Sequence, residues 1–237
     1  MEARRHLVGS SLASLLETLR PALMLRRDED ATSHLGGSPT SQRVGGWPTT
    51  SYGRGLSLLA EFTLSREHAN LLGLPGPGVL AFYFDSVEAP WSTTGDALRV
   101  EYVEGARTYA IVPPNDCDQF DEVRVGLVET EIPRLGVPTT DTLSAYRALQ
   151  EKLDPRDAPL AFLGGHAFPL QTPMEDECAS IIPAVPASEW RLLLQLDTDR
   201  RAGFAWGSGS GRLYFWIPEE DLARARFERV VAITQDT

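Results

Sequence analysis

The sequence predicts a single, mainly β domain with a few short helices (an α+β protein), built from two halves related by a pseudo-twofold axis. An apolar strand at 56–62 precedes a glycine-led aromatic strand at 76–84, and the same pair recurs at 190–197 and 209–217. The internal spacing of the two pairs agrees to within one residue. Because each half is too small to bury its own aromatic strand, we expect the halves to bury one another in one core.

The N-terminal segment, residues 1–31, predicts a helix and a strand packed on the main domain. Leucines at helical spacing over 12–19 form an apolar stripe, and Pro21 ends this helix because it lacks a backbone donor. Residues 22–25 then predict a short strand. The main domain is expected over 32–237, with its first half at about 32–135 and its second at about 160–237.

Glycine and proline mark the connections between the remaining elements. The stretch 33–55 predicts a loop, and a second loop opens at 162–165. Ser65 can cap a helix at 66–72, which Gly73 would end in a left-handed conformation. The other expected elements are helices at 140–153 and after Pro218, and strands at 56–64, 79–84, 98–103, 123–128, 190–197, 212–217 and 230–234.

The overall charge excludes some classes of protein. The formal net charge of −11 argues against a protein that follows nucleic-acid phosphates. No apolar run approaches the roughly 20 residues that a membrane-spanning helix needs, and the N-terminal segment reads as an amphipathic helix rather than a secretory signal. We therefore expect a cytoplasmic protein that contacts neither nucleic acid nor membrane.

Much of this charge comes from residues 85–131, which carry eleven acidic residues against three arginines. The stretch could be an ordinary solvated face of a soluble protein. It could also be a surface that attracts a basic protein partner through its electrostatic field. The sequence leaves both interpretations open.

Neither a metal nor a cofactor is expected. The two cysteines, Cys117 and Cys178, lie in unrelated contexts, whereas a structural zinc site needs four ligands in close pairs. The Gly-Gly pairs at 36–37 and 164–165 permit positive φ or the close approach of another backbone. Neither pair lies in a phosphate-binding or dinucleotide-binding motif.

Taken together, these motifs resemble the YwqG-like family, a bacterial group known as a domain of unknown function. The resemblance covers the chain from about Leu15 to the C-terminus. It implies a mainly β, roll-like fold and no established activity. The chain departs from the family pattern at 165–166. The matching pieces are 34–39, Trp47-Pro48, the first strand and its glycine-led successor, 163–165, Gln171, 174–178, 190–197, Trp206-Gly207, 211–215 and Asp221-Leu222.

Several acids are candidate catalytic residues. Glu175, Asp176 and Glu177 flank Cys178 and could bind a metal or perform acid–base chemistry, or could simply satisfy loop donors and a nearby arginine. Glu61, Gln195 and Asp197 lie in or beside apolar strands at matching places in the two halves, and the halves could bring Glu61 and Gln195 together. A buried polar network and the polar floor of a cleft are both compatible with this pattern.

Aromatic and histidine side chains are candidates for binding. Trp47 and Trp206 could line a groove, as could Trp91, whereas Trp190 and Trp216 lie inside strands and are expected in the core. His166 could act as a base or a ligand, although no catalytic triad pattern accompanies it. The other histidines, His6, His34 and His68, are expected at the surface.

Two function hypotheses follow. The first is a non-enzymatic binding module whose acidic surface holds a basic protein partner. The second is a hydrolase with a cleft between the two halves, in which Glu177 acts with Glu61 or Asp197. Two or more of these acids in one concave pocket would favour the enzyme, and acids held in structural pairs would favour the binding module.

Overall fold

A computed structural model describes residues 17–40, 46–88, 92–104, 112–134 and 161–236. The helix expected at 12–19 lies largely outside these residues, and the one expected at 140–153 lies wholly outside them. So do His6 and Trp91. Within the described part of the chain, no helix is long and apolar enough to cross a membrane.

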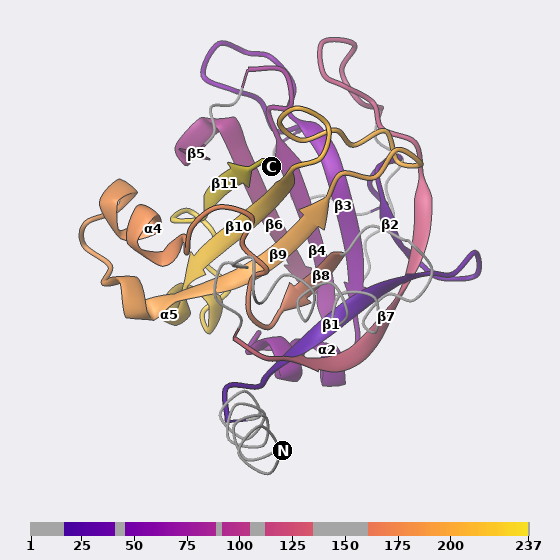
Figure 1. Cartoon of the computed structure of the whole chain (residues 1–237). Coiled ribbons are helices and arrows are strands. Elements are labelled where there is room, and N and C mark those ends of the chain that lie inside the picture. Colours follow the sequence, from indigo (N-terminus) through magenta and orange to yellow (C-terminus); the bar gives the residue numbers. More distant parts are fainter. Residues whose placement is uncertain (1–16, 41–45, 89–91, 105–111, 135–160, 237) are drawn as a thin grey trace, which may run out of the picture.

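In the described residues, eleven strands form one antiparallel sheet that curls into a nearly closed, barrel-like roll (Figure 1). The fold class is therefore as the sequence predicts, a mainly β single domain with short helices. The strands are β1 (Arg20–Arg27), β2 (Ser33–Leu35), β3 (Ser57–Leu64), β4 (Gly78–Phe84), β5 (Ser92–Thr93), β6 (Leu98–Glu104), β7 (Val123–Ile132), β8 (Ala161–Gly164), β9 (Trp190–Asp197), β10 (Arg212–Pro218) and β11 (Val231–Gln235).

The order of strands is symmetric about the centre of the sheet. From one edge inward it runs β6–β4–β3–β2–β7, and from the other, after the short β5, it runs β11–β10–β9–β8–β1. β1 and β7 pair at the centre over eight residues. The N-terminal strand β1 lies next to β8 of the second half, just as β7 lies next to β2 of the first half.

A β-bulge at the same position confirms the correspondence between the two halves. In β3, Leu59 is left without a partner in β4, and in β9 Leu193 is left without a partner in β10. A bulge bends a strand and increases its twist, so both arms of the sheet curl at equivalent points. Curling brings β4 against β10.

The core between the halves is aromatic. The ring of Phe215 in β10 lies 5.1 Å from that of Phe82 and 6.2 Å from that of Phe84, both in β4 and both at edge-to-face angles. These side chains belong to one cluster with residues from both halves. Each aromatic strand is therefore buried by the other, as the repeat predicts.

The outer face of each half carries its own smaller cluster under a long loop. On the first half, Trp47 in the loop before β3 packs on Tyr83 and Leu58. On the second half, the loop between β8 and β9 covers Trp216 and Tyr214. The outer face of each arm of the sheet is thus covered by a loop and not by solvent.

The short elements follow local signals. Ser65 caps α2 (Arg66–Leu72) by accepting from the His68 amide, and Gly73 ends it with φ of 80°, as predicted. The other short elements are α4 (Glu175–Ile181), α5 (Glu219–Leu222) and the 3-10 turns η1 (Gly95–Ala97) and η2 (Ala187–Glu189).

Three elements differ from the sequence prediction. β2 and β8 lie in stretches expected to be loop, and α4 lies in the second of these expected loops. β2 and β8 have only three and four residues, too few to show the period of a strand. The N-cap of α4 is Met174, whose side chain makes no capping hydrogen bond, so the usual start signal of a helix is missing.

Gly36 shows why the first Gly-Gly pair is needed. Its φ is 57°, and a Cβ added there would collide with the backbone carbonyl of Asp121. We expect Gly36→Ala to lower the free energy of unfolding by about 2 kcal/mol, because left-handed strain and a backbone clash act together. Gly53→Ala is the control, since its φ is 85° but nothing lies within 4 Å of the added atom. Equal losses in the two variants, measured by urea unfolding, would contradict the close approach.

Candidate functional site

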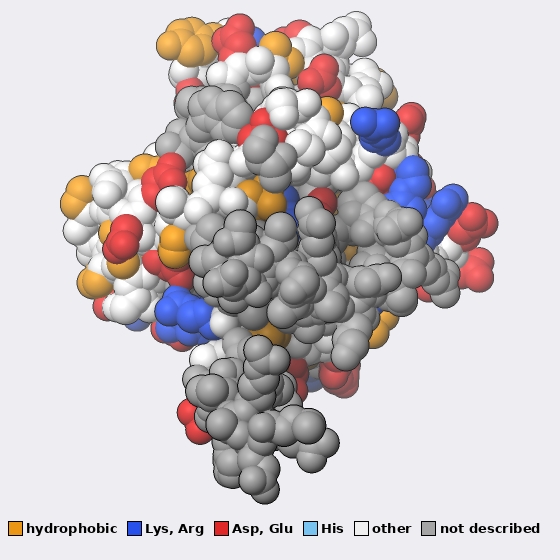
Figure 2. All heavy atoms as spheres, viewed as in Figure 1, with side chains coloured by type: hydrophobic (Ala, Val, Ile, Leu, Met, Phe, Trp, Pro, Cys, Tyr) orange, Lys and Arg blue, Asp and Glu red, His pale blue; other side chains and the backbone are white. Residues whose placement is uncertain are grey.

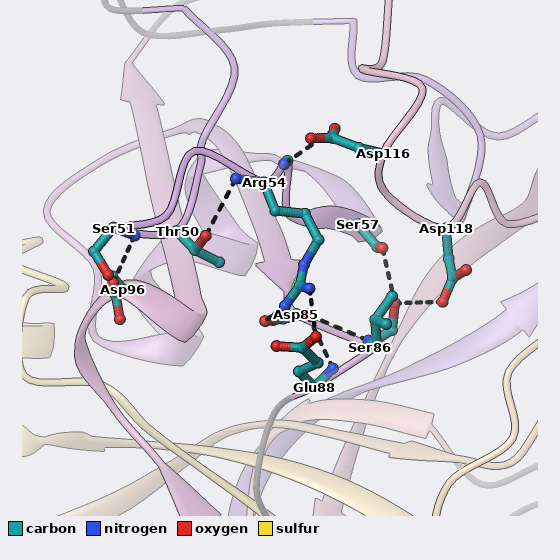
Figure 3. Close-up of polar contacts among 12 residues, drawn as sticks. Thr50, Ser51, Arg54, Ser57, Asp85, Ser86, Glu88, Asp96, Asp116 and Asp118 are labelled. Atoms are coloured by element: carbon teal, nitrogen blue, oxygen red, sulfur yellow. Dashed lines mark hydrogen bonds and ion pairs between the residues drawn. The ribbon is translucent and has the colours of Figure 1, made fainter.

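At one end of the barrel, the described residues bring several acidic side chains close to Arg54 (Figure 3). We call these carboxylates the acidic end: Asp85, Glu88, Asp96, Asp116 and Asp118. They come from the loop after β4, from η1 and from the chain before β7. Arg54 lies in the turn that leads into β3.

A tight turn at residues 50–53 positions Arg54. The Gly53 amide donates to the Thr50 carbonyl at 2.9 Å, and Gly53 has φ of 85°, which glycine adopts without strain. The guanidinium lies 2.5 Å from Asp85 Oδ2 and 3.0 Å from Glu88 Oε1. These two carboxylates raise the pKa of Arg54, so it stays charged.

The other carboxylates hold backbone and hydroxyl donors. Asp96 accepts from the Ser51 amide at 2.6 Å, and Asp116 accepts from the Gly55 amide at 3.2 Å. Asp118 accepts from the Ser86 hydroxyl at 2.7 Å. Backbone amides hold Asp96 and Asp116, and a hydroxyl holds Asp118, so the directions of these carboxylates are fixed before any partner binds.

The acidic end is strongly negative and mostly open to solvent. Asp85 is buried, but the other four acids are exposed. Among the described residues, these five carboxylates and the Arg54 guanidinium together carry a formal charge of −4, and Arg54 contacts two of the five, Asp85 and Glu88. Figure 2 shows Asp and Glu side chains spread over the top of the view, from which these loops project.

The acidic stretch 85–131 is not one continuous face. In the β4–β6 ladder Phe84 pairs with Leu98 and Gly78 with Glu104, so Glu104 lies at the far end of β6 from the acidic end. Glu129 and Glu131 lie toward the end of β7 that is farther from the acidic end. Of the acidic stretch 85–131, we therefore keep only the acidic end as the candidate surface for a basic partner.

Glu61 is a buried carboxylate that ties down the loop of the first half. Its side chain is 1% exposed and accepts from the Thr40 amide at 3.0 and 3.1 Å and from the Thr40 hydroxyl. His34 Nε2 lies 3.7 Å away, and His34 Nδ1 contacts the Gly36 carbonyl at 2.8 Å. His34 is thus buried, at 3% exposure, and its expected place at the surface was wrong.

Gln195 likewise holds the loop of the second half through a buried side-chain acceptor. It is fully buried, and its Oε1 accepts from the Phe168 amide at 2.9 Å. Phe168 follows the second glycine of its Gly-Gly pair by three residues, as Thr40 does. Glu61 and Gln195 do not meet: four strands separate β3 from β9 in the sheet, and each side chain lies under its own loop. The expectation of one shared polar site is corrected.

The contact between His34 and Glu61 is expected to make stability depend on pH. Burial alone would lower the pKa of His34, but the Glu61 carboxylate and the Gly36 carbonyl outweigh it and raise this pKa above 6.5. The stabilisation is then fully present below the unfolded-state pKa and is lost as pH rises through the raised folded-state value. We expect the urea midpoint to fall above about pH 6.5, and to fall less in His34→Gln.

Burial also raises the pKa of Glu61, but His34 and Thr40 outweigh this and lower it below 4.5. Its contribution is therefore present above that unfolded-state value and is lost as pH falls through the lowered one. His68→Gln, which changes a histidine on α2, is the control for the expected fall of the urea midpoint at alkaline pH. Identical pH profiles for His34→Gln and the unmodified chain would contradict the assignment.

The sequence of this chain matches the model of one protein family. A family model described as a domain of unknown function (DUF1963) matches residues 33–235. The chain belongs to this family. No curated protein matches it. The DUF1963 match begins at β2, so it leaves out β1, although β1 lies at the centre of the sheet.

The remaining acidic candidates of this DUF1963 protein are held apart. Asp197 Oδ1 forms an ion pair with Arg212 Nε at 2.6 Å, inside the second half. Glu177 lies half-buried on α4. Among the described residues, no group of three or more His, Cys, Asp or Glu is arranged to hold a metal ion.

The aromatic and histidine candidates have separate places. Trp47 donates from Nε1 to the Leu56 carbonyl at 2.8 Å and packs on the first half. Trp206 is 5% exposed in the shared core, so it does not line a groove as expected. Trp190 and Trp216 are buried, as predicted. His166 contacts the Thr18 carbonyl through Nε2 at 2.8 Å and lines a cavity beside Glu175 and Asp176.

Sequence reasoning missed Arg54 as the centre of the acidic end. The available signal was its place in a Thr-Ser-Tyr-Gly-Arg-Gly turn just before an apolar strand. Its partners lie more than thirty residues away along the chain, and only the pairing of β3 with β4 brings them together.

Proposed function

We propose that this protein is a non-enzymatic, cytoplasmic interaction module whose acidic end receives a basic protein partner. We also propose that it is a YwqG-like member of its family. The observation that carries the proposed function is the acidic end itself, whose described carboxylates and Arg54 carry a formal charge of −4 and are held by hydrogen bonds and ion pairs. A fixed, exposed set of like charges steers a partner of opposite charge and selects its orientation.

The carboxylates suggested for hydrolysis support this choice. Glu61 is engaged with Thr40 and His34, and Asp197 with Arg212. Glu177, the acid that either would act with, lies on α4, whose Cys178 packs in the cluster of the second half. A pair of catalytic carboxylates would need to flank one substrate bond at about 5 to 10 Å. We therefore prefer binding to hydrolysis.

The experiment uses an arginine-rich peptide as a probe, immobilised on a biosensor. We expect the chain to bind it with an association rate that falls as salt rises. The double variant Glu88→Gln/Asp118→Asn removes two charges and keeps hydrogen-bond acceptors at both positions. We expect it to lower the association rate by about threefold or more at low salt.

The matched control is Glu129→Gln/Glu131→Gln, which changes the net charge equally but acts on exposed residues of β7 away from the acidic end. A control that weakens binding as much as the test variant would show attraction by net charge alone and would overturn the proposal. Hydrolysis of ester or glycoside substrates that disappears in Glu177→Gln, at a half-buried position of α4, would instead support the enzyme.

A further inference from the structure

The strand β6 forms one edge of the sheet and has a strand on only one side. Among the described residues it pairs with β4 alone, and the opposite edge of the sheet is the two-residue β5. An edge strand presents a row of backbone donors and acceptors that can bind another strand, and proteins often limit this by keeping the edge strand very short. β5 is short in this way, but β6 has seven residues. It is therefore long enough to pair with a further strand.

The ladder with β4 determines which backbone groups of β6 point outward. The Asp85 amide donates to the Ala97 carbonyl at 2.9 Å, and these two residues continue the β4–β6 register by one step. Hydrogen-bonded and non-hydrogen-bonded pairs alternate along an antiparallel ladder. Every second residue counted from Ala97 therefore bonds to β4, and the residues between them have their amides and carbonyls facing away from the sheet. These outward residues are Leu98, Val100, Tyr102 and Glu104.

Open space, and not packed side chains, borders part of this edge. A cavity of about 310 Å³ is lined by four consecutive residues of β6, 98–101, and also by Phe227 and Glu228. Consecutive side chains of a strand point to opposite faces, so a cavity that contacts all four residues runs along the edge of the strand. In the described part of the chain, nothing forms a hydrogen bond with the outward backbone groups of Leu98, Val100 or Tyr102.

The charges of β6 make this edge complementary to a second copy of itself. Arg99 is exposed and Glu101 is half-buried, and their spacing of two places both on the outer face of the sheet. When two β6 strands pair antiparallel with Val100 opposite Val100, outward backbone groups meet outward backbone groups. In this register Arg99 of each copy lies opposite Glu101 of the other copy. Opposite charges that face each other across a ladder are stabilising.

The neighbouring registers are repulsive. Moving the second copy by two residues in one direction places Glu101 opposite Glu101, and in the other direction it places Arg99 opposite Arg99. Like charges directly opposite each other destabilise a strand pair. Moving it by one residue brings outward groups opposite groups that already bond to β4. Charges that merely protect an edge from copies of itself would repel in the register that hydrogen bonding favours, whereas Arg99 and Glu101 attract there.

We propose that this chain forms a twofold-symmetric homodimer in which the β6 edges of two copies pair, with Val100 on the symmetry axis. The interface is isologous, because the same edge serves in both copies, and it joins the two sheets into one continuous sheet. The pairing uses none of the carboxylates of the acidic end. The homodimer and the binding of a basic partner can therefore fail separately.

The mass of the full chain across a range of concentrations tests the proposal, measured by light scattering and sedimentation. We expect a dimer that dissociates on dilution, with a dissociation constant on the order of 10 µM, since pairing at one strand edge buries a small surface. Hydrogen exchange should slow at the amides of Leu98, Val100 and Tyr102 as concentration rises, and should stay unchanged at Arg99 and Glu101, whose amides bond to β4.

A chain that is monomeric at every concentration would overturn the proposal. The same conclusion would follow if the outward amides of β6 became protected only when the arginine-rich peptide is added, because the edge would then receive a foreign strand.

Charge reversal tests the register. We expect Arg99→Glu and Glu101→Arg each to weaken dimerisation by about tenfold or more, because two attractive cross-strand pairs become repulsive. A mixture of these two variants should dimerise again, since each like-charged edge then meets an edge of the opposite sign. The double variant Arg99→Glu/Glu101→Arg should dimerise by itself, because the exchanged charges still face each other across the axis.

Glu129→Arg, at an exposed position of β7, changes the net charge as Glu101→Arg does and is the control. Circular dichroism checks that each variant folds, and the double variant, which keeps the composition of the chain, tests the register if a single variant does not fold. Single variants that dimerise as well as the unmodified chain, or a mixture and a double variant that stay monomeric, would contradict the pairing.

Discussion

A chain that begins at Ser33, where the family match begins, is expected not to fold. It would lack β1, which pairs with β7 over eight residues and with β8 over three. Four consecutive side chains of β1 are buried: Ala22, Leu23, Met24 and Leu25. The three larger ones contribute about 1.5 to 3 kcal/mol each, which together approaches the whole stability of an ordinary domain, about 5 to 15 kcal/mol.

Removing β1 also separates the two halves. β8 and β7 would become unpaired edges facing each other across a gap one strand wide, about 10 Å from strand to strand. The shared core of Phe82 and Phe215 depends on the curl of one continuous sheet. We expect residues 33–237 to aggregate or to unfold without cooperativity, and residues 17–237 to show a cooperative urea transition.

Two further measurements separate loss of β1 from a general effect of truncation. A synthetic peptide of residues 17–31, added to 33–237 during refolding, is expected to restore the cooperative transition. The full-length variant Leu23→Asp, which places a charge at a fully buried position of β1, is expected to be destabilised by more than about 3 kcal/mol. Cooperative unfolding of 33–237 with an unchanged midpoint would contradict the central role of β1.

The role of β1 also shows what the sequence could and could not predict. The strand itself was visible, because Ala22 to Leu25 form an apolar run after a proline. The repeat predicted that two halves share one core, and the packing of β4 on β10 confirms it. The place of β1 could not be predicted, because pairing between β1, β7 and β8 is a long-range choice that leaves no local period.

The candidate site was less predictable for the same reason. The acidic residues of 85–131 were visible as a charge imbalance, but their division between the two ends of β6 and β7 depends on strand register. The burial of His34 depends on β2, a strand of three residues held between β3 and β7. The cavity that His166 lines is formed in part by α4, for which the sequence shows no capping side chain.

Glu61→Ala is expected to lower the free energy of unfolding by about 4 kcal/mol, and Gln195→Ala by about 2 kcal/mol. Both changes remove the buried acceptor that fixes a loop after a Gly-Gly pair. Loss of Gln195 leaves the Phe168 amide unsatisfied, at a cost of about 1 to 3 kcal/mol. Loss of Glu61 removes the carboxylate that accepts from the Thr40 amide and hydroxyl and that lies beside His34. Breaking a buried charged pair in this way costs about 3 to 5 kcal/mol.

Exchanging the carboxylate of Glu61 and the amide of Gln195 tests why one half uses a glutamate where the other uses a glutamine. Glu61 pairs across the ladder with His34, whereas Gln195 pairs with Phe162 at the equivalent position. Across the ladder a carboxylate therefore faces a histidine in the first half and an aromatic ring in the second, where Gln195 Nε2 also lies 3.5 Å from the carboxylate of Asp197, itself paired with Arg212. We expect Gln195→Glu to be destabilising at pH 7, by about 2 kcal/mol or more, and to recover stability near pH 4 as the buried acid is protonated. Urea unfolding of Glu61→Gln and Gln195→Glu across this range makes the comparison, and a Gln195→Glu chain as stable as the unmodified one at pH 7 would contradict it.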